Sequence, residues 1–198
     1  MGIITKKYIQ DAFTYEEYRQ LGKDLISQGK TTGPNQSQDF LNYSKLNDKR
    51  MDRVDKTQEL EPETIAAMKG ILAPQYWVVI TELWCGDAAI SLPVIEKMAA
   101  QSKRVRLSIL LRDDNTEVMD EYLTDGARSI PKLIMLDADY NEIGLWGPRP
   151  DAAQEIMRKW KETENTDKSA MLEDVQRWYI QDKGKTIQEE IISLLPQQ

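Results

Sequence analysis

Residues 76–88 read Tyr-Trp-Val-Val-Ile-Thr-Glu-Leu-Trp-Cys-Gly-Asp-Ala. The first six are β-branched or aromatic in an unbroken run, which predicts a strand buried on both faces. From Ala88 to Gln101, the length and the spacing of the apolar residues indicate a helix. Trp84 and Cys85 therefore lie in the turn between a buried strand and the helix that follows it.

Strand and helix signals continue to alternate after this turn. The runs predict strands at 105–111, 132–136 and 143–146, and helices at 116–123 and 151–160, the last of them capped by Asp151. The order β-α-β-α-β-β-α puts parallel strands first and a hairpin last, which predicts an α/β sandwich. We take residues 71–162 as this central domain.

Both flanks of the central domain show helical spacing. Within residues 1–70, Thr14 and Glu17 form a capping-box pattern before an amphipathic helix, and Pro62 suits the first turn of a short one. Residues 163–198 contain amphipathic stretches that are not apolar enough to stand alone. We therefore expect helical N- and C-terminal extensions that pack on the central domain or on a second copy of the chain, as a homodimer.

The composition excludes several classes of protein. The 198 residues include 26 Lys and Arg against 33 Asp and Glu, a net charge of −7, so nucleic acid is not an expected partner. No apolar run approaches the roughly 18 residues of a membrane span, and the N-terminus lacks the apolar core of a signal peptide. We expect a cytoplasmic protein without a membrane partner.

The chain has no histidine and one cysteine. This excludes histidine-based catalytic dyads and most zinc sites, so no metal site is expected.

Cys85 is the residue whose position favours chemistry. A cysteine at the start of a helix meets free backbone N–H groups and the positive end of the helix dipole, which stabilise a thiolate. Such cysteines have pKa values of roughly 3.5 to 7.5, below the ordinary value of about 8.5. We therefore expect Cys85 to be a nucleophile with a lowered pKa. The alternative is an inert, buried cysteine, which is the more common state of an isolated thiol.

The motifs around this turn resemble those of the thioredoxin family. Trp84-Cys85-Gly86 matches the Trp-Cys-Gly start of the family's active site, and Pro93 stands where the family has a proline in the active-site helix. Residues 126–136 are similar to its Gly-x-Arg-x-Ile-Pro segment and the strand after it. The resemblance implies a thioredoxin-like three-layer α/β/α sandwich with a mixed sheet over 71–162. It also implies a cis peptide at Ile130-Pro131 that faces the thiol.

Two positions depart from the family pattern. Ala88 stands where the family has its second, resolving cysteine, and Val79 stands where it has a buried acid. An internal dithiol cycle is therefore excluded, and the site is a single-cysteine Trp-Cys-Gly-Asp-Ala sequence in place of CxxC.

The resemblance implies a thiol-disulfide oxidoreductase in cell redox homeostasis that works through one cysteine. Cys85 would attack a protein disulfide or a low-molecular-weight disulfide, and an external thiol such as glutathione would release the adduct. No bound cofactor is expected. The residues implied to shape the substrate-binding groove are Trp84, Gly86, Asp87, Ile130 and Pro131.

Charged residues near these motifs have simpler interpretations beside the functional ones. Arg128 and Arg149 are candidate contacts for an anionic substrate. Asp87 is expected to cap the helix, because a carboxylate pointing at the thiol would raise the pKa of Cys85. The acidic pairs at 113–114 and at 137 and 139 are interpreted as turn and cap residues rather than metal ligands.

Two other functions stay open at this point. One is a redox-inert thioredoxin-fold module that binds a partner protein through the same groove, so whether the chain is an enzyme is undecided. The other is an iron–sulfur cluster shared between two chains with glutathione, as resemblance to single-cysteine glutaredoxins allows. The cluster is disfavoured, because Gly86-Asp87-Ala88 replaces the Gly-Phe-Ser of those proteins.

Overall fold

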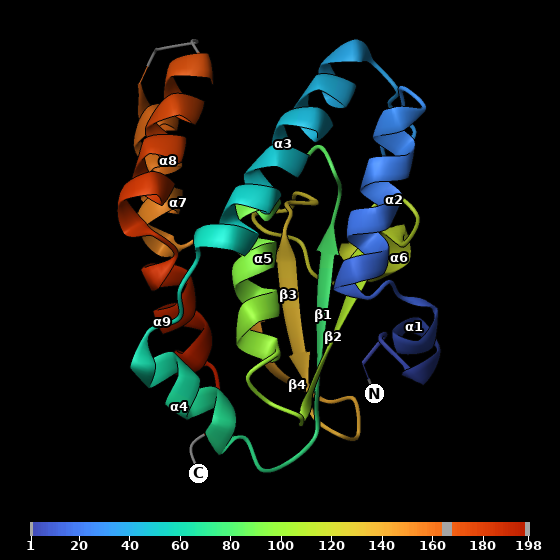
Figure 1. The fold of residues 1–198 in the computed structure, drawn as a ribbon, viewed down its shortest axis with the longest axis vertical. Coiled ribbons are helices and arrows are strands. Elements are labelled where there is room, and N and C mark those ends of the chain that lie inside the picture. The colour runs from blue at the N-terminus through green and yellow to red at the C-terminus, as the bar shows by residue number, and fades with distance from the viewer. Residues whose placement is uncertain (1, 164–167, 197–198) are drawn as a thin grey trace.

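The computed structural model describes residues 2–163 and 168–196. Its strands are β1 Gln75–Thr81, β2 Val105–Leu111, β3 Lys132–Leu136 and β4 Glu142–Trp146. They form one sheet in the order β2-β1-β3-β4, with helices on both sides of it (Figure 1). β1 and β2 are parallel, whereas β3 is antiparallel to both β1 and β4. The expected α/β sandwich with a mixed sheet is confirmed.

The helices of the described residues lie between and around these strands. They are α1 Lys6–Asp11, α2 Tyr15–Ser27, α3 Gln38–Thr57, α4 Pro62–Gly70, α5 Ala88–Ala99, α6 Thr116–Asp120, α7 Asp151–Glu162, α8 Lys168–Asp182 and α9 Lys185–Ser193. The capping box of Thr14 and Glu17 is present at the start of α2, and Pro62 occupies the first turn of α4. α1 was not predicted, because its six residues are too few to show a helical period.

The central strand β1 separates two layers of apolar packing. Trp77 and Val79 point to one face, where α2, α5 and α9 contribute the core. Val78 and Ile80 point to the other face, where α1 and α6 cover the sheet. All four side chains are 0% exposed, which explains why the run shows no polar alternation.

Both helical extensions pack on the central domain. α3 lies along α5, α4 contacts α9, and α9 contacts α5 (Figure 1). Arg19 of α2 forms ion pairs with Asp48, Asp52 and Asp55, which fixes α2 against α3. The N-terminal segment also reaches the sheet, because the backbone N–H and C=O of Phe13 both pair with Ile109 at the edge of β2.

The structure corrects the prediction that Asp151 caps its helix. Pro150 occupies the N-cap position of α7, and Asp151 is the first helical residue. The backbone N–H of Asp151 donates to the carboxylate of Glu190 at 2.8 Å, so a side chain of α9, rather than Asp151, satisfies a free N–H group at the start of α7.

None of the helices among the described residues has both the length and the apolar composition of a membrane span.

Candidate functional site

Cys85 lies in a tight turn that connects β1 to α5. Its N–H donates to the carbonyl of Glu82 at 3.1 Å, and its carbonyl accepts from Ala89 at 3.2 Å, so the residue joins the turn to the first turn of the helix. Pro93 lies inside α5, as the resemblance implied. Cys85 is a free cysteine and is 7% exposed.

The thiol meets the loop that precedes β3. Sγ of Cys85 donates to the carbonyl oxygen of Ile130 at 3.3 Å, and the peptide bond between Ile130 and Pro131 is cis. The fold therefore brings together two segments that are 45 residues apart in the sequence. Ile130 is itself buried and belongs to the same apolar cluster as Cys85.

The electrostatic surroundings of the thiol oppose ionisation. Burial raises the pKa of Cys85 to about 12, and the carboxylate of Asp87 adds to the rise. The backbone N–H groups of Ala88 and Asp87 and the charge of Arg149 lower this pKa, but they do not outweigh burial. The expected lowering of the pKa of Cys85 is thus wrong for this geometry. The helix terminus contributes as expected, yet removing the sulfur from water costs the thiolate more.

Asp87 has a different role from the helix cap that was predicted. Its backbone already has helical angles (φ −69°, ψ −41°), and its side chain makes no capping hydrogen bond. An N-cap residue needs a non-helical backbone to turn its side chain toward the following N–H groups. Instead, Asp87 accepts from Arg149 at 2.6 Å and from the hydroxyl of Tyr179 at 3.1 Å. Burial raises the pKa of Asp87, against the influence of Arg149, Tyr179 and Arg50.

Helix α3 holds the turn from the other side. The amide of Asn47 donates to the carbonyl of Leu83 at 3.0 Å and accepts from Arg50 at 3.1 Å. The guanidinium of Arg50 lies so close to Gly86 that a Cβ on this glycine would be 3.5 Å from it. Arg50 thus lies against the turn at a distance of ordinary van der Waals contact.

Trp84 is half-buried and forms a wall beside the turn. The ring of Phe40 meets it edge-on at 4.9 Å, and the guanidinium of Arg112 lies over it at 4.7 Å. An aromatic face and a cation at this distance attract each other. These contacts fix the orientation of Trp84 next to Cys85.

The two candidate anion contacts lie in different surroundings. Arg149 is beside the thiol, on Asp87. Arg128 makes two hydrogen bonds to Asp120, at 2.6 and 2.7 Å, and its side chain is 45% exposed. The structure therefore groups Trp84, Gly86, Asp87, Ile130, Pro131 and Arg149 around Cys85, and it pairs Arg128 with the surface of α6.

The acidic pairs act in turns. Asp137 accepts from the backbone N–H groups of Asp139 and Asn141, both through one carboxylate oxygen, which is an Asx-type turn between β3 and β4. Asp113 pairs with Arg112 at 2.8 Å. Among the residues that the structure describes, no three His, Cys, Asp or Glu side chains are grouped so that they could hold a metal ion.

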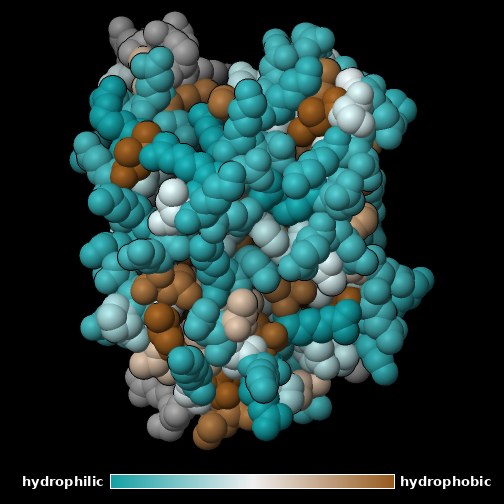
Figure 2. All heavy atoms as spheres, viewed as in Figure 1, coloured by the Kyte–Doolittle hydropathy of each residue, from teal (hydrophilic) through white to brown (hydrophobic). Residues whose placement is uncertain are grey.

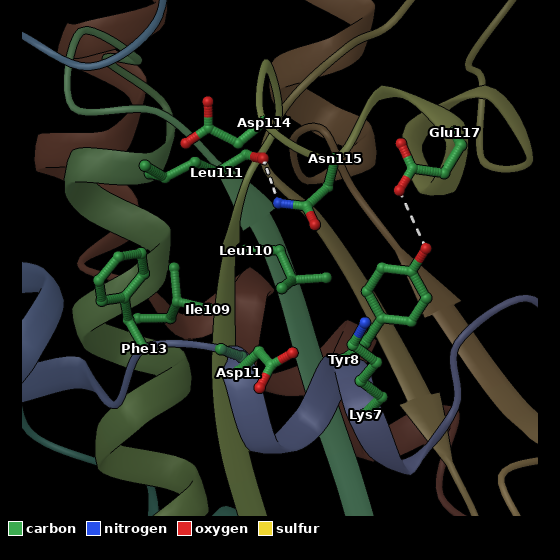
Figure 3. A pocket seen from close by; sticks show the side chains of 11 residues that line it. Lys7, Tyr8, Asp11, Phe13, Ile109, Leu110, Leu111, Asp114, Asn115 and Glu117 are labelled. Carbon is green, nitrogen blue, oxygen red and sulfur yellow. Dashed lines mark hydrogen bonds between the residues drawn. The ribbon is translucent and has the colours of Figure 1, made fainter.

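A cavity of about 400 Å³ lies between α1, the end of β2 and α6 (Figure 3). The hydroxyl of Tyr8 donates to Glu117 at 2.9 Å, and the amide of Asn115 donates to the carbonyl of Leu111 at 2.8 Å. These lining groups already satisfy one another. Cys85 does not line this cavity, which we therefore separate from the candidate site.

Sequence reasoning missed Asn47, Arg50 and Tyr179. Each comes from a helical extension and reaches the turn only through tertiary packing, at sequence separations of up to 92 residues. Their types carry no signal by themselves, because Asn, Arg and Tyr are ordinary residues of amphipathic helices.

The chain is similar to known proteins in both sequence pattern and fold. A family model described as thioredoxin matches residues 33–178. The crystal structure of an HIV epitope-scaffold is similar with a TM-score of 0.57 and 15% sequence identity, over 87% of this chain and 95% of the other. A protein of unknown function from Pseudomonas aeruginosa is similar with a TM-score of 0.56 and 15% identity, over 92% and 96% of the two chains. At this identity the similarity shows the fold alone. The comparison with curated proteins found no match.

Proposed function

Because this chain belongs to the thioredoxin family, we propose that it is a thiol-disulfide exchange protein that works through the single sulfur of Cys85. The observation that carries this proposal is the contact of 3.3 Å between Sγ and the carbonyl of Ile130, next to the cis bond to Pro131. This contact supports the proposal because it places the sulfur, at the turn between β1 and α5, against the loop along which a disulfide substrate would bind.

The loop also offers backbone groups to an extended substrate. The N–H of Ile130 has no hydrogen-bond partner in the described part of the chain, and its carbonyl accepts only the weak thiol donor. A substrate strand that pairs with both groups would bring its own sulfur toward Cys85, as strand addition does at an open backbone edge. Trp84 would cover the other side of the substrate.

The proposed reaction has two exchange steps, and each of them forms one S–S bond as another breaks. The Cys85 thiol loses its proton to solvent, and the thiolate attacks one sulfur of a disulfide; a bond to Cys85 forms, the S–S bond breaks, and the second sulfur leaves as a thiolate. An external thiolate then attacks the substrate sulfur of the mixed disulfide and releases Cys85. No second cysteine exists to release it from within the chain.

A second candidate function is favoured by a specific observation. Burial and Asp87 raise the pKa of Cys85 to about 12, so the thiol is neutral at pH 7 in this structure. A redox-inert module that binds a partner segment at the Ile130 loop would need no thiolate. The two candidates share the binding edge and differ only in whether the sulfur reacts.

The deciding experiment is incubation of the folded protein with oxidised glutathione from pH 7 to 10, followed by intact-mass measurement. Exchange predicts one glutathione adduct on the chain, formed faster as pH rises, and none on Cys85→Ser. If the folded protein gains no adduct at any of these pH values, whereas the denatured protein gains one, exchange is excluded and the binding module is supported.

A further inference from the structure

The two helical extensions enclose a groove of about 730 Å³ over the start of α5. One wall is α3 with the segment that follows it, and the other is α8 with the start of α9; in Figure 1, α3 lies above α5, and α8 and α9 stand to the left of both. Ile90 of α5 and Tyr179 of α8 also line it. The groove is thus next to Asp87, which accepts from Tyr179, but it does not include Cys85.

Positive charge prevails along the groove. Arg50 and Arg53 lie one helical turn apart on α3, and Lys183 lies on the opposite wall. Lys185 is neutralised by Glu61 at 3.1 Å, so Glu59 is the remaining lining carboxylate that could offset them. A net cationic groove on a chain with a net charge of −7 is a local departure from the overall charge, and it favours an anionic ligand.

Arg50 is the group best placed to bind that anion. It is half-buried, and burial lowers the pKa of Arg50, with Asp87 acting in the opposite direction. Among the described residues, its guanidinium makes one hydrogen bond, to Asn47, and no ion pair. A guanidinium has five N–H donors. Asp87 attracts Arg50 only at longer range: its carboxylate pairs with Arg149 and Tyr179 and forms no ion pair with Arg50, so the remaining Arg50 donors stay open to a ligand.

Apolar side chains lie between the cations. Val54 of α3, Ile90 of α5 and Ile180 of α8 line the groove, and Ile180 is 56% exposed although it is large and apolar. In the space-filling view, apolar side chains form small patches in a mostly hydrophilic face (Figure 2). The lining therefore matches a ligand with one apolar part and one charged end.

We propose that this groove binds a small organic anion that has an apolar body and one carboxylate. The carboxylate accepts hydrogen bonds from Arg50, with Arg53 and Lys183 adding long-range attraction, and the apolar body lies on Val54, Ile90 and Ile180. The volume lies within the range of about 300–1,000 Å³ that is usual for small-molecule sites. This site does not depend on a reactive Cys85.

The test is calorimetric titration of the full chain with octanoate and with octylamine, which share an alkyl chain of eight carbons and differ in charge. We expect one octanoate per chain and no binding of octylamine. Arg50→Gln keeps a donor for Asn47 but removes the charge, and it should weaken octanoate binding about tenfold or more, the loss typical of a charge-assisted hydrogen bond. Arg177→Gln is the matched control, because Arg177 lies on α8, pairs with Asp174 and does not line the groove.

Two further variants keep the outcomes distinct. Ile180→Asp places a like charge and a polar group on the apolar part of the groove, and it should abolish octanoate binding. Cys85→Ser should leave that binding unchanged, so failure of the exchange reaction would not remove this site. The proposal is overturned if octanoate does not bind, if octylamine binds as tightly, or if folded Arg50→Gln binds octanoate like the unchanged chain.

Discussion

The carboxylate of Asp87 is the second cause of the raised pKa of Cys85, after burial, and Asp87→Asn tests whether this charge limits the proposed exchange reaction. The substitution removes the carboxylate charge of Asp87, which is the second-largest cause, after burial, of the raised pKa of Cys85. It also leaves Arg149 without its ion-pair partner and close to the sulfur. Both changes favour the thiolate, while Asn can still accept from Tyr179.

The magnitude follows from the charges. A nearby cation that is no longer neutralised lowers the pKa of a neighbouring acid by about 1–3, and we take about 2 for Cys85. The thiolate fraction at pH 7 then rises about 100-fold. Because nucleophilicity falls with pKa through a Brønsted coefficient of about 0.4–0.5, roughly tenfold of this gain is lost. The exchange rate at pH 7 should therefore rise by about tenfold.

The assay is the second-order rate of mixed-disulfide formation with oxidised glutathione at pH 7. Asp120→Asn is the matched control, because it removes the same charge from the exposed pair with Arg128. Circular dichroism must show that Asp87→Asn is folded, since an unpaired buried Arg149 is destabilising. A folded Asp87→Asn protein that reacts no faster than Asp120→Asn would refute this account of the site.

Three other changes test separate parts of the structure. Arg149→Gln should slow the same exchange reaction, because it removes the cation that lowers the pKa of Cys85; a faster rate would contradict the arrangement. Burial raises the pKa of the Cys85 thiol from 9.0, its value in the unfolded chain, to about 12 in the folded one. The free energy of unfolding is therefore unaffected by this thiol below about pH 9 and falls as pH rises from there to about 12. Urea titrations should therefore show the unchanged chain losing about 4 kcal/mol more than Cys85→Ala over this range. Gly147→Ala should lower the free energy of unfolding by about 3 kcal/mol or more, because φ is +105° and the new Cβ would collide with the carbonyl of Pro131; an unchanged urea midpoint would argue against that close approach.

Local patterns in the sequence were sufficient for most of the fold. The strand from 105 to 111 and the strand from 132 to 136 were predicted with their observed bounds, because both are short segments rich in Val, Ile and Leu, as strands are. The capping box of Thr14 and Glu17 was also predictable, since all its partners lie within four residues.

The chemistry of the site depended on contacts that no local pattern contains. A helix start lowers the pKa of a cysteine wherever it occurs, but the burial of Cys85 depends on the Ile130 loop and on the surrounding core. The partner of Asp87 was equally hidden, because Arg149 follows the last strand and Tyr179 lies in the C-terminal extension. Sequence reasoning therefore located the sulfur and gave the wrong sign for its acidity.

The pairing of Phe13 with Ile109 covers part of an open edge of the sheet. Outer strands expose backbone donors and acceptors that recruit strands from other molecules, and β2 is an outer strand here. Phe13 occupies these groups at the middle of β2, and α1 lies beside them. Cleavage after residue 14 would expose these backbone groups, and we expect the truncated chain to associate through β2 more readily than the full chain.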